Sequence, residues 1–347
     1  MSGVDVTVVV GTCAHERTDY AVRLAAATRR ALFPSRRLAT TTDPIGTAVS
    51  LLPWAQSSGA IVELPTTAPL DDFVTTAAHP SSACGVSSII CVADAMHLID
   101  DLRSDTYAVT KLVPSDDPPG SMSREHTAVA LFTARQLEGA STVVLVNWQG
   151  LATPNLTSLV ALVSHLNPTA EVMLDADPLR EPSGVPRDVD PARITAGWAA
   201  LLQGRHRPPH TDRRIGALHY AQLRPFHPTR LRSLLDDRLD PREFGTVIRS
   251  AGFCRIATRA SVLARWDHVG QVCSIEPTAT PHAPETAVRL AATGQDLAFF
   301  GIDLRADALR IALDEAALTD AELTDGPLAW AAYADPFPAW KPAARPR

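Results

Sequence analysis

The sequence lacks any apolar run of the roughly 20 residues that a membrane-spanning helix needs. The longest candidate, from Val86 to Ile99, is broken by polar side chains that include Asp94 and His97. The segment from Met1 to Gly11 has neither a basic leader nor a cleavage-site pattern, so we expect no signal peptide there. These absences predict a cytoplasmic protein that has no membrane partner.

Cysteine is also sparse, and neither sign of charge dominates the chain. Five scattered cysteines among 347 residues predict reduced thiols rather than a disulfide framework. The net charge is −6, with acidic and basic residues interspersed. That balance excludes a broad non-specific nucleic-acid surface. Short basic runs, such as the one within residues 205–214, are interpreted as solvated faces or linker charge, so we do not expect direct nucleic-acid binding.

The chain is long enough for two modest domains, and its first half alternates apolar strands with amphipathic helices. The predicted strands are Val6–Val10, Ala60–Leu64, Val86–Val92 and Thr142–Asn147. The predicted helices are Asp19–Leu32, Leu70–Ala77, Met122–Glu138 and Pro154–Leu166. Continuous apolar strands between such helices indicate a parallel sheet covered on both faces. Residues 1–174 are therefore predicted to form an α/β domain with its ligand edge at the strand C-termini.

The second half begins with a proline-rich stretch and continues as a different kind of domain. Residues 175–214 are interpreted as a linker containing one helical segment, Ala192–Leu202. Predicted strands follow at Ala217–Leu223, Gly245–Ile248, Cys254–Thr258, Gln271–Ile275 and Leu297–Asp303, with helices at Thr229–Asp237 and Arg305–Ala317. This mixture predicts a smaller α+β domain over residues 215–340. The chain from Asp335 is expected to be loosely ordered, with 341–347 as a flexible tail.

The turn after the first predicted strand is the first candidate site. It reads Gly11-Thr12-Cys13-Ala14-His15-Glu16-Arg17-Thr18, which has the position and length of a phosphate loop, G-x-x-x-x-G-K-[ST]. Gly11 and Thr18 fit, but Arg17 replaces the lysine and Glu16 replaces the second glycine. A glutamate brings a Cβ and a negative charge to a place where backbone N–H groups surround phosphate oxygens. Taken alone, the string is more typical of an ordinary strand–turn–helix than of a phosphate loop.

Two further strand ends carry candidate ligand-binding residues. Glu63 lies at the end of a buried strand, where an acid beside a phosphate loop could hold a magnesium-bound water. Asn147 begins Asn147-Trp148-Gln149-Gly150, which matches the position of the guanine-reading N-K-x-D turn. Gly150 stands where an aspartate would accept two hydrogen bonds from guanine. Charged hydrogen bonds contribute about 1.5–3 kcal/mol each, so losing both predicts roughly two to four orders of magnitude lower affinity.

Several motifs in the second half resemble the C-terminal domain of the CobW-like metal-trafficking GTPases. Arg224-Pro225-Phe226-His227-Pro228-Thr229-Arg230-Leu231 is similar to that domain's R-P-F-H-P-x-R-[LF] opening. Val247-Ile248-Arg249-Ser250-Ala251-Gly252-Phe253 resembles its V-[LI]-R-[SA]-K-G-[FY] strand, with alanine in place of lysine. In the first half, Gln136-Leu137-Glu138-Gly139-Ala140 and Leu166-Asn167-Pro168 resemble the family's Q-[IL]-E-x-A and L-N-P elements. The resemblance covers roughly residues 4–340 and implies a P-loop GTPase-like sheet followed by a CobW C-terminal domain.

The resemblance implies more chemistry than the chain retains. Family members are GTPases that deliver zinc, cobalt or iron to client proteins, so GTP, magnesium and zinc are the implied cofactors. Glu63 matches the acid of the family's E-x-x-G element, although Thr66 stands in place of its glycine. The family's C-x-C-C metal motif is missing, because no cysteine lies between Cys13 and Cys84. Loop lysine, base-reading aspartate and metal thiolates are thus all absent together.

Other metal ligands and nucleophiles give weaker signals. Cys84 and Cys91 are interpreted as buried structural thiols, and His79 near Cys84 is a weak zinc candidate. Four histidines could instead form a weak zinc site in the linker and early second domain, which needs three or four convergent ligands: His206, His210, His219 and His227. We therefore predict no metal residues and no catalytic residues, and take Gly11, Arg17, Thr18, Glu63 and Asn147 as the candidate cofactor-binding set.

The sequence predicts a CobW-like accessory protein of metal homeostasis, most plausibly of zinc, that has lost efficient GTP hydrolysis and acts through protein contacts. Its partner would be a client protein, such as a metalloprotein. One alternative is a working metallochaperone in which Arg17 serves the phosphates, Thr18 the magnesium and Glu63 the water. Another is an interaction protein like the CobW-like factor that recruits a hibernation protein to ribosomes.

Overall fold

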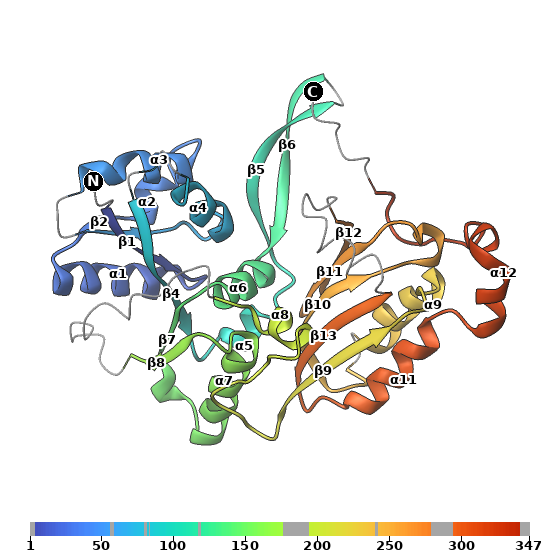
Figure 1. The fold of residues 1–347 in the computed structure, drawn as a ribbon. Helices are drawn as coiled ribbons and strands as arrows, with labels where there is room; N and C mark the ends of the chain where they lie inside the picture. Colours follow the sequence, from blue (N-terminus) through green and yellow to red (C-terminus); the bar gives the residue numbers. More distant parts are fainter. Residues whose placement is uncertain are drawn as a thin grey trace. The chain divides into compact units, whose positions relative to one another are not determined.

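The computed structural model describes residues 4–55, 59–79, 82, 84–116, 119–175, 194–239, 242–278 and 294–340. The chain divides into two compact units, the first formed by Met1–Gly197 with Arg207–Thr211, the second by Trp198–His206 with Asp212–Arg347. Figure 1 shows the elements of both units. Within the described ranges, no helix is long and apolar enough to cross a membrane.

The first unit is built on a six-stranded sheet with the order β2-β3-β1-β4-β7-β8. All five neighbouring pairs in this sheet are parallel. The strands are β1 (Val4–Val10), β2 (Ala31–Phe33), β3 (Ala60–Glu63), β4 (Cys84–Asp94), β7 (Thr142–Val146) and β8 (Glu171–Leu174). The α/β prediction is confirmed, and the C-terminal ends of β1, β3, β4 and β7 share one edge because the strands are parallel.

Helices between the strands supply the rest of this unit's core. They are α1 (Ala14–Thr28), α2 (Ser35–Leu38), α3 (Pro44–Leu51), η1 (Leu52–Trp54), α4 (Leu70–Ala77), α5 (Leu98–Asp101), α6 (Val129–Glu138), η2 (Trp148–Gly150) and α7 (Thr153–Leu166). Tyr20 and Leu24 of α1 pack with Val9, Ile61 and Ile90 of the central strands. This contact fixes the start of α1 against the end of β1.

Two predicted helices had wrong bounds. The helix predicted over Asp19–Leu32 is wrong at both ends, since α1 runs from Ala14 to Thr28. The segment expected to be helical from Met122 is a strand up to Ala128, because β5 (Tyr107–Asp116) and β6 (Pro119–Ala128) pair as an antiparallel hairpin. The helix predicted to reach Leu32 ends at Thr28, where Arg29 takes the left-handed conformation with φ of 55° and closes the helix. A left-handed residue after a helix redirects the chain, here into β2.

The two family motifs of the first half meet at one buried amide. The Asn167 Nδ2 donates to the carbonyl oxygens of Leu137, Glu138 and Ala140 at 2.8, 3.1 and 2.8 Å. Its Oδ1 accepts from the Ala170 backbone N–H at 3.1 Å. Asn167 therefore holds the end of α6 to the end of α7.

The second unit contains a five-stranded sheet with the order β12-β11-β10-β13-β9, and all of its pairs are antiparallel. Its strands are β9 (Ile215–Gln222), β10 (Thr246–Cys254), β11 (Ala264–Val269), β12 (Val272–Pro277) and β13 (Gln295–Ile302). The helical elements are α8 (Gly197–Leu202), α9 (Pro228–Ser233), the π-helical η4 (Leu234–Leu239), η5 (Ala257–Arg259), α11 (Ala306–Ala316) and α12 (Asp320–Trp330). The α+β prediction for this part is confirmed.

The arginine- and proline-rich motif at the start of α9 joins three parts of this unit. Phe226 is fully buried and bridges to Ile256 on one side and to Ala317 on the other. Pro228 starts α9, a position where the missing N–H of proline is harmless. Arg230 forms two parallel hydrogen bonds to Glu322, at 2.8 and 2.7 Å. The motif therefore has a structural role: it connects α9 to η5, to the end of α11 and to α12.

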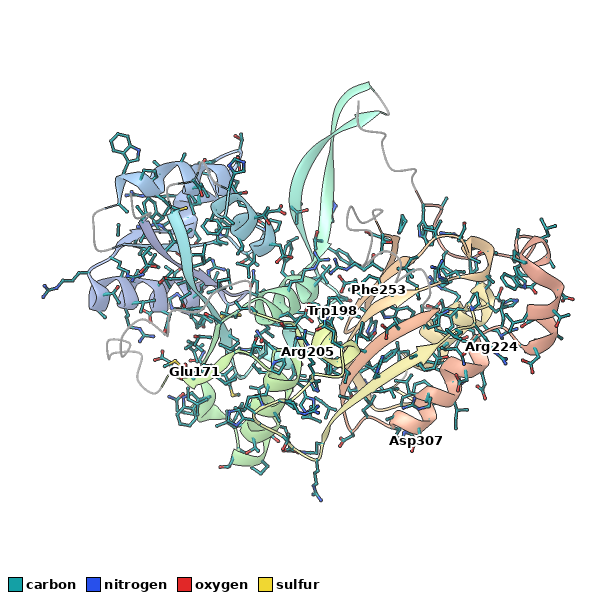
Figure 2. All side chains as sticks on the ribbon, viewed as in Figure 1. Glu171, Trp198, Arg205, Arg224, Phe253 and Asp307 are labelled. Carbon is teal, nitrogen blue, oxygen red and sulfur yellow. The ribbon has the colours of Figure 1, made fainter. Side chains whose placement is uncertain are left out.

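Three details of the second unit differ from the sequence prediction. Residues 246–254 form one strand, so the predicted strand at Cys254–Thr258 is wrong beyond its first residue. The segment from Asp335 to Trp340 is anchored, because the Arg259 guanidinium bonds Asp335 at 2.9 Å and lies over the Trp340 ring. In the predicted linker, the helix begins at Gly197, and Trp198 packs edge-on against Phe253 at 6.4 Å (Figure 2). The predicted tail at 341–347 and much of the linker, residues 176–193, lie outside the described residues.

Candidate functional site

The turn between β1 and α1 is too short to be an open phosphate loop. Helix α1 begins at Ala14, and the Arg17 N–H already donates to the Cys13 carbonyl at 2.9 Å. Residues 14–16 are therefore helical, although the phosphate-loop pattern places them in the loop. Glu16 explains the difference, since a glutamate favours a helical turn far more than the glycine it replaces. Only Gly11, Thr12 and Cys13 remain between strand and helix.

Gly11 is required by the close approach of a neighbouring strand. Its φ is 150°, and a Cβ at this position would lie 2.2 Å from the Val92 carbonyl oxygen of β4. The Cys13 thiol donates to the same carbonyl at 3.2 Å. Burial, followed by the charge of Glu16, raises the pKa of Cys13 to about 12, so this thiol stays protonated. The turn between β1 and α1 thus packs directly against β4.

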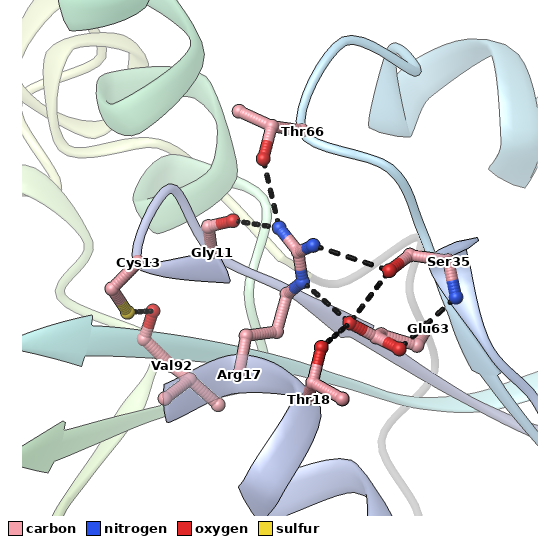
Figure 3. A network of polar contacts seen from close by, with 8 residues as sticks. All are labelled: Gly11, Cys13, Arg17, Thr18, Ser35, Glu63, Thr66 and Val92. Atoms are coloured by element: carbon pink, nitrogen blue, oxygen red, sulfur yellow. Dashed lines mark hydrogen bonds and ion pairs between the residues drawn. The ribbon is translucent and has the colours of Figure 1, made fainter. Parts of the chain in front are cut away.

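The Arg17 side chain folds back over this turn, as Figure 3 shows. Its guanidinium donates to the Gly11 carbonyl oxygen and, at 2.8 Å, to the Thr66 hydroxyl. Its Nε donates to Glu63 Oε1 at 3.1 Å, and both side chains are almost completely buried. The Arg17 guanidinium therefore donates its hydrogen bonds to protein acceptors. It lies where the lysine of a phosphate loop would contact the phosphate.

Glu63 is the centre of the network and is completely buried. Its carboxylate accepts from the Thr18 hydroxyl at 2.6 Å, from the Ser35 hydroxyl at 2.8 Å and from the Ser35 N–H at 3.0 Å. Burial acts to raise the pKa of Glu63, but the bonds from Thr18, Ser35 and Arg17 outweigh it and hold the pKa below its ordinary value. Glu63 is thus a satisfied anion.

These residues do not fit a magnesium–nucleotide complex as they are arranged. A magnesium ion would need the Thr18 oxygen and a water near Glu63, and a triphosphate would need free loop N–H groups. Here Thr18 donates to Glu63, and the guanidinium of Arg17 lies between Gly11 and Glu63. Four of the predicted cofactor-binding residues lie together in a closed ion-pair network: Gly11, Arg17, Thr18 and Glu63.

Sequence reasoning missed Ser35 as a member of this network. Ser35 is the first residue of α2, follows Pro34 and belongs to no motif, so no signal in the sequence pointed to it. Thr66 was visible, because it stands in the position of the family's glycine. Its hydroxyl now accepts from Arg17, which gives the substitution a physical role.

Asn147, the remaining predicted residue, lies at the end of β7. It takes the left-handed conformation with φ of 56° and is exposed. The next residue, Trp148, donates its indole N–H to the Asp175 carbonyl at 3.0 Å, and the Asp175 carboxylate pairs with Arg23 of α1 at 2.5 Å. The tryptophan therefore ties this turn to the end of β8. It does not take the lysine's place over a base.

Gly150 lies beside the flexible Met96 side chain. A Cβ built on Gly150 would lie 2.7 Å from the Met96 sulfur. Met96 follows Asp94, whose carboxylate accepts from the Met96 N–H at 2.9 Å and contacts the His97 ring at 2.8 Å. Asp94 thus serves to fix the turn after β4.

The predicted weak metal ligands have separate roles. Cys91 is buried in β4, whereas Cys84 is only half-buried, so the buried interpretation was wrong for Cys84. His219 pairs with Asp296 at 2.7 Å, and His227 stacks on Tyr333 with ring centres 4.7 Å apart. In the described part of the chain, no three His, Cys, Asp or Glu side chains are arranged to hold a metal ion.

Comparison with known proteins shows which proteins the chain is similar to. Residues 215–317 match the model of the "Cobalamin synthesis protein cobW C-terminal domain". A curated relative from Dictyostelium discoideum, "Zinc-regulated GTPase metalloprotein activator 1", is 24% identical over 224 residues. The chain is therefore similar to CobW-like proteins, and its residues 215–317 match their C-terminal domain.

The matches cover only part of the chain or have low similarity, so the activities of these relatives cannot be assigned to this chain from the matches alone. The alignment with the Dictyostelium protein covers 58% of this chain and 47% of its relative, so the chain spans about half the length of that relative. The crystal structure of the zinc-bound YjiA GTPase from E. coli aligns with 92% of this chain and 100% of its own, at 11% identity and a TM-score of 0.34. A zinc-bound triple mutant of YjiA gives 12% identity and the same TM-score. Scores this low add nothing to the argument.

Proposed function

We propose that this CobW-like protein is an accessory factor of zinc homeostasis whose first domain does not use guanine nucleotides. The proposal rests on one observation above all, the buried network of Arg17 with Gly11, Glu63 and Thr66. The same atoms that would serve phosphate and magnesium are bonded to each other. The protein then acts through contacts with a client protein.

Energetics support a permanent closure. Removing one partner from a buried ion pair costs about 3–5 kcal/mol, because it leaves an uncompensated charge. A nucleotide would have to separate Arg17 from Glu63 and also unwind the first turn of α1, from Ala14 to Glu16. The guanine contacts that could offset this cost are gone, since Trp148 and Gly150 replace the lysine and the aspartate.

The zinc and client parts of the proposal are supported by the relative. The name of the Dictyostelium protein describes a zinc-regulated GTPase that activates a metalloprotein. The family's C-x-C-C thiolates are missing here, so metal delivery through that motif is not proposed. A role in recognising the client is compatible with a nucleotide pocket that is closed.

Titration of the full chain with GTP and Mg²⁺, read by calorimetry and by thermal unfolding, tests the nucleotide claim. A ligand at 1,000 times its Kd stabilises a protein by about 4.1 kcal/mol. Micromolar affinity would therefore raise the Tm by roughly 8–16 °C at millimolar GTP. We expect no shift and no heat of binding with GTP or GDP. Saturable binding at micromolar GTP would refute the closed pocket.

A hydrolysis assay separates this proposal from a working metallochaperone. If Arg17, Thr18 and Glu63 serve catalysis, GTP turnover is measurable and falls in the Arg17→Ala variant. We expect neither the parent nor Arg17→Ala to release phosphate above the background of a heat-denatured sample. Turnover that disappears on Arg17→Ala would establish the enzyme instead.

A further inference from the structure

A cavity of about 220 Å³ lies beside the β11–β12 hairpin of the second unit. The π-helical η4 supplies Leu235, Asp236 and Leu239 to its wall, and the hairpin supplies His268 and Cys273. An imidazole, a thiol and a carboxylate are all ligands of transition metals. His268, Cys273 and Asp236 belong neither to the buried network of Arg17 and Glu63 nor to the motif at the start of α9.

His268 presents an acceptor that the protein leaves unsatisfied. The residue is 4% exposed, and its Nδ1 has no hydrogen-bond partner among the described residues. Burial and then the charge of Arg249 lower the pKa of His268 to about 4, although the Asp267 carboxylate and a hydrogen bond to the Gly270 backbone act to raise it. The ring is therefore neutral at pH 7, and donation to Gly270 leaves the lone pair on Nδ1. A buried lone pair without a partner is costly unless something binds it.

Cys273 stands directly opposite His268 in the hairpin register. Cross-strand partners place their Cβ atoms about 4.5–5.5 Å apart and their side chains on one face of the sheet. That separation allows an imidazole nitrogen and a sulfur to reach one ion, at about 2.0–2.1 and 2.3 Å respectively. Cys273 lies on the edge strand β12 and is exposed, so an ion can enter from solvent.

We propose that His268 and Cys273 form a two-residue binding site for a borderline or soft metal ion of the Zn²⁺ class. On binding, the thiol proton leaves to solvent and the sulfur forms the bond to the metal. The Asp236 carboxylate is bonded to Arg232 at 2.5 Å, which leaves it outside the set. Two protein ligands leave coordination positions open to water or to a second molecule. The inference does not depend on the closure of the nucleotide pocket.

Cobalt(II) titration of the reduced full-length protein tests this site, because a cobalt–thiolate bond gives a sulfur charge-transfer band in the near ultraviolet. We expect such a band, its displacement by Zn²⁺, and at least tenfold weaker intensity in Cys273→Ser. The matched control Cys84→Ser should keep the full band. A band that persists in Cys273→Ser, or no band at all, would overturn the proposal.

A second measurement avoids any doubt about folding of the variants. In the unmodified protein, Zn²⁺ should slow alkylation of Cys273 at least tenfold, as followed by mass spectrometry of the peptides. The rates for Cys13 and Cys84 should stay unchanged. In His268→Asn, which keeps a polar side chain, the protection of Cys273 should be lost. Equal alkylation rates with and without Zn²⁺ in the parent protein would refute the site.

Discussion

Among the described residues, each unit buries one arginine against one carboxylate, and the two pairs differ in their place in the fold. Arg249 of β10 bonds Asp267 of β11 at 2.5 Å, between neighbouring strands of an antiparallel sheet. Arg17 and Glu63 join a helix start to the end of a parallel strand, at the edge where α/β sheets bind ligands. The first pair is part of the sheet, and the second occupies a ligand position.

The two arginines also differ in the acceptors around them, and this difference bears on the proposed closure of the nucleotide pocket. Arg249 has further acceptors in the carbonyls of Ser250 and His268, at 3.0 and 3.1 Å, so its charge is held by the sheet itself. Glu63 keeps the hydroxyls of Thr18 and Ser35, groups that suit a magnesium site equally well. The proposed closure of the nucleotide pocket therefore depends on Arg17, whereas Arg249 is part of the sheet.

The largest effect is expected from Arg249→Met, which leaves Asp267 buried without its main partner. We expect a loss of about 3–5 kcal/mol in the free energy of unfolding of the second unit. Scanning calorimetry should show the corresponding transition lowered by roughly 6–20 °C. The matched control is Arg265→Met, because Arg265 also faces Asp267, at 3.7 Å, but is 52% exposed. A control effect as large as that of Arg249→Met would contradict the assignment.

Arg17→Met should cost less, about 2–4 kcal/mol, because Glu63 keeps its bonds to Thr18 and Ser35. Chemical denaturation followed by a probe in the first unit measures the loss. Adding Glu63→Gln removes the unpaired charge, so the double variant should recover at least about 1 kcal/mol relative to Arg17→Met. If the two losses simply add, the side chains do not form the pair described.

A smaller and pH-dependent effect is expected at Glu322, which caps α12 and accepts two bonds from Arg230. The Arg230 bonds, against burial, lower the pKa of Glu322 to about 2 from 4.5. A depressed pKa adds stability above pH 4.5 that is lost as the pH falls toward 2. Glu322→Gln keeps the cap, so we expect a loss of about 1 kcal/mol at pH 7, allowing for solvent screening.

That loss should shrink between pH 4.5 and the acid limit of folding, as urea unfolding at several pH values would measure. Glu315→Gln is the control, since Glu315 also pairs with an arginine, Arg238, but is 60% exposed. Its effect should stay below about 0.5 kcal/mol at every pH. A Glu322→Gln loss independent of pH would show that charge is not the cause.

The sequence predicted the sheet of each unit because buried strands and motif order are local signals. Both ends of the helix from Leu70 to Ala77 were predicted correctly. The hairpin of β5 and β6 was missed because β6 runs directly into α6. The sequence pattern from Met122 to Glu138 was therefore interpreted as one helix. Strand β11 was missed because Arg265 and Asp267 interrupt its apolar pattern, although Asp267 is buried by its pairing with Arg249.

The candidate site could be predicted only as a set of residues. Gly11, Arg17, Thr18 and Glu63 follow from motif positions, and they do converge. The bonds between them could not be predicted, since the direction of a guanidinium depends on the start of α1 three residues earlier. Ser35 comes from a segment with no pattern.

The smallest effect is expected from Gly150→Asp, which restores the acid of the guanine-reading turn without opening the pocket. Gly150 is exposed, and the new Cβ meets only the flexible end of Met96, so stability should change by less than about 0.5 kcal/mol. GTP should still fail to bind in calorimetry, because Arg17 continues to fill the phosphate end while Trp148 stays bonded at Asp175. If this single change brought micromolar GTP binding, the missing aspartate would be the whole defect. The network of Arg17 and Glu63 would then be a resting arrangement that nucleotide displaces.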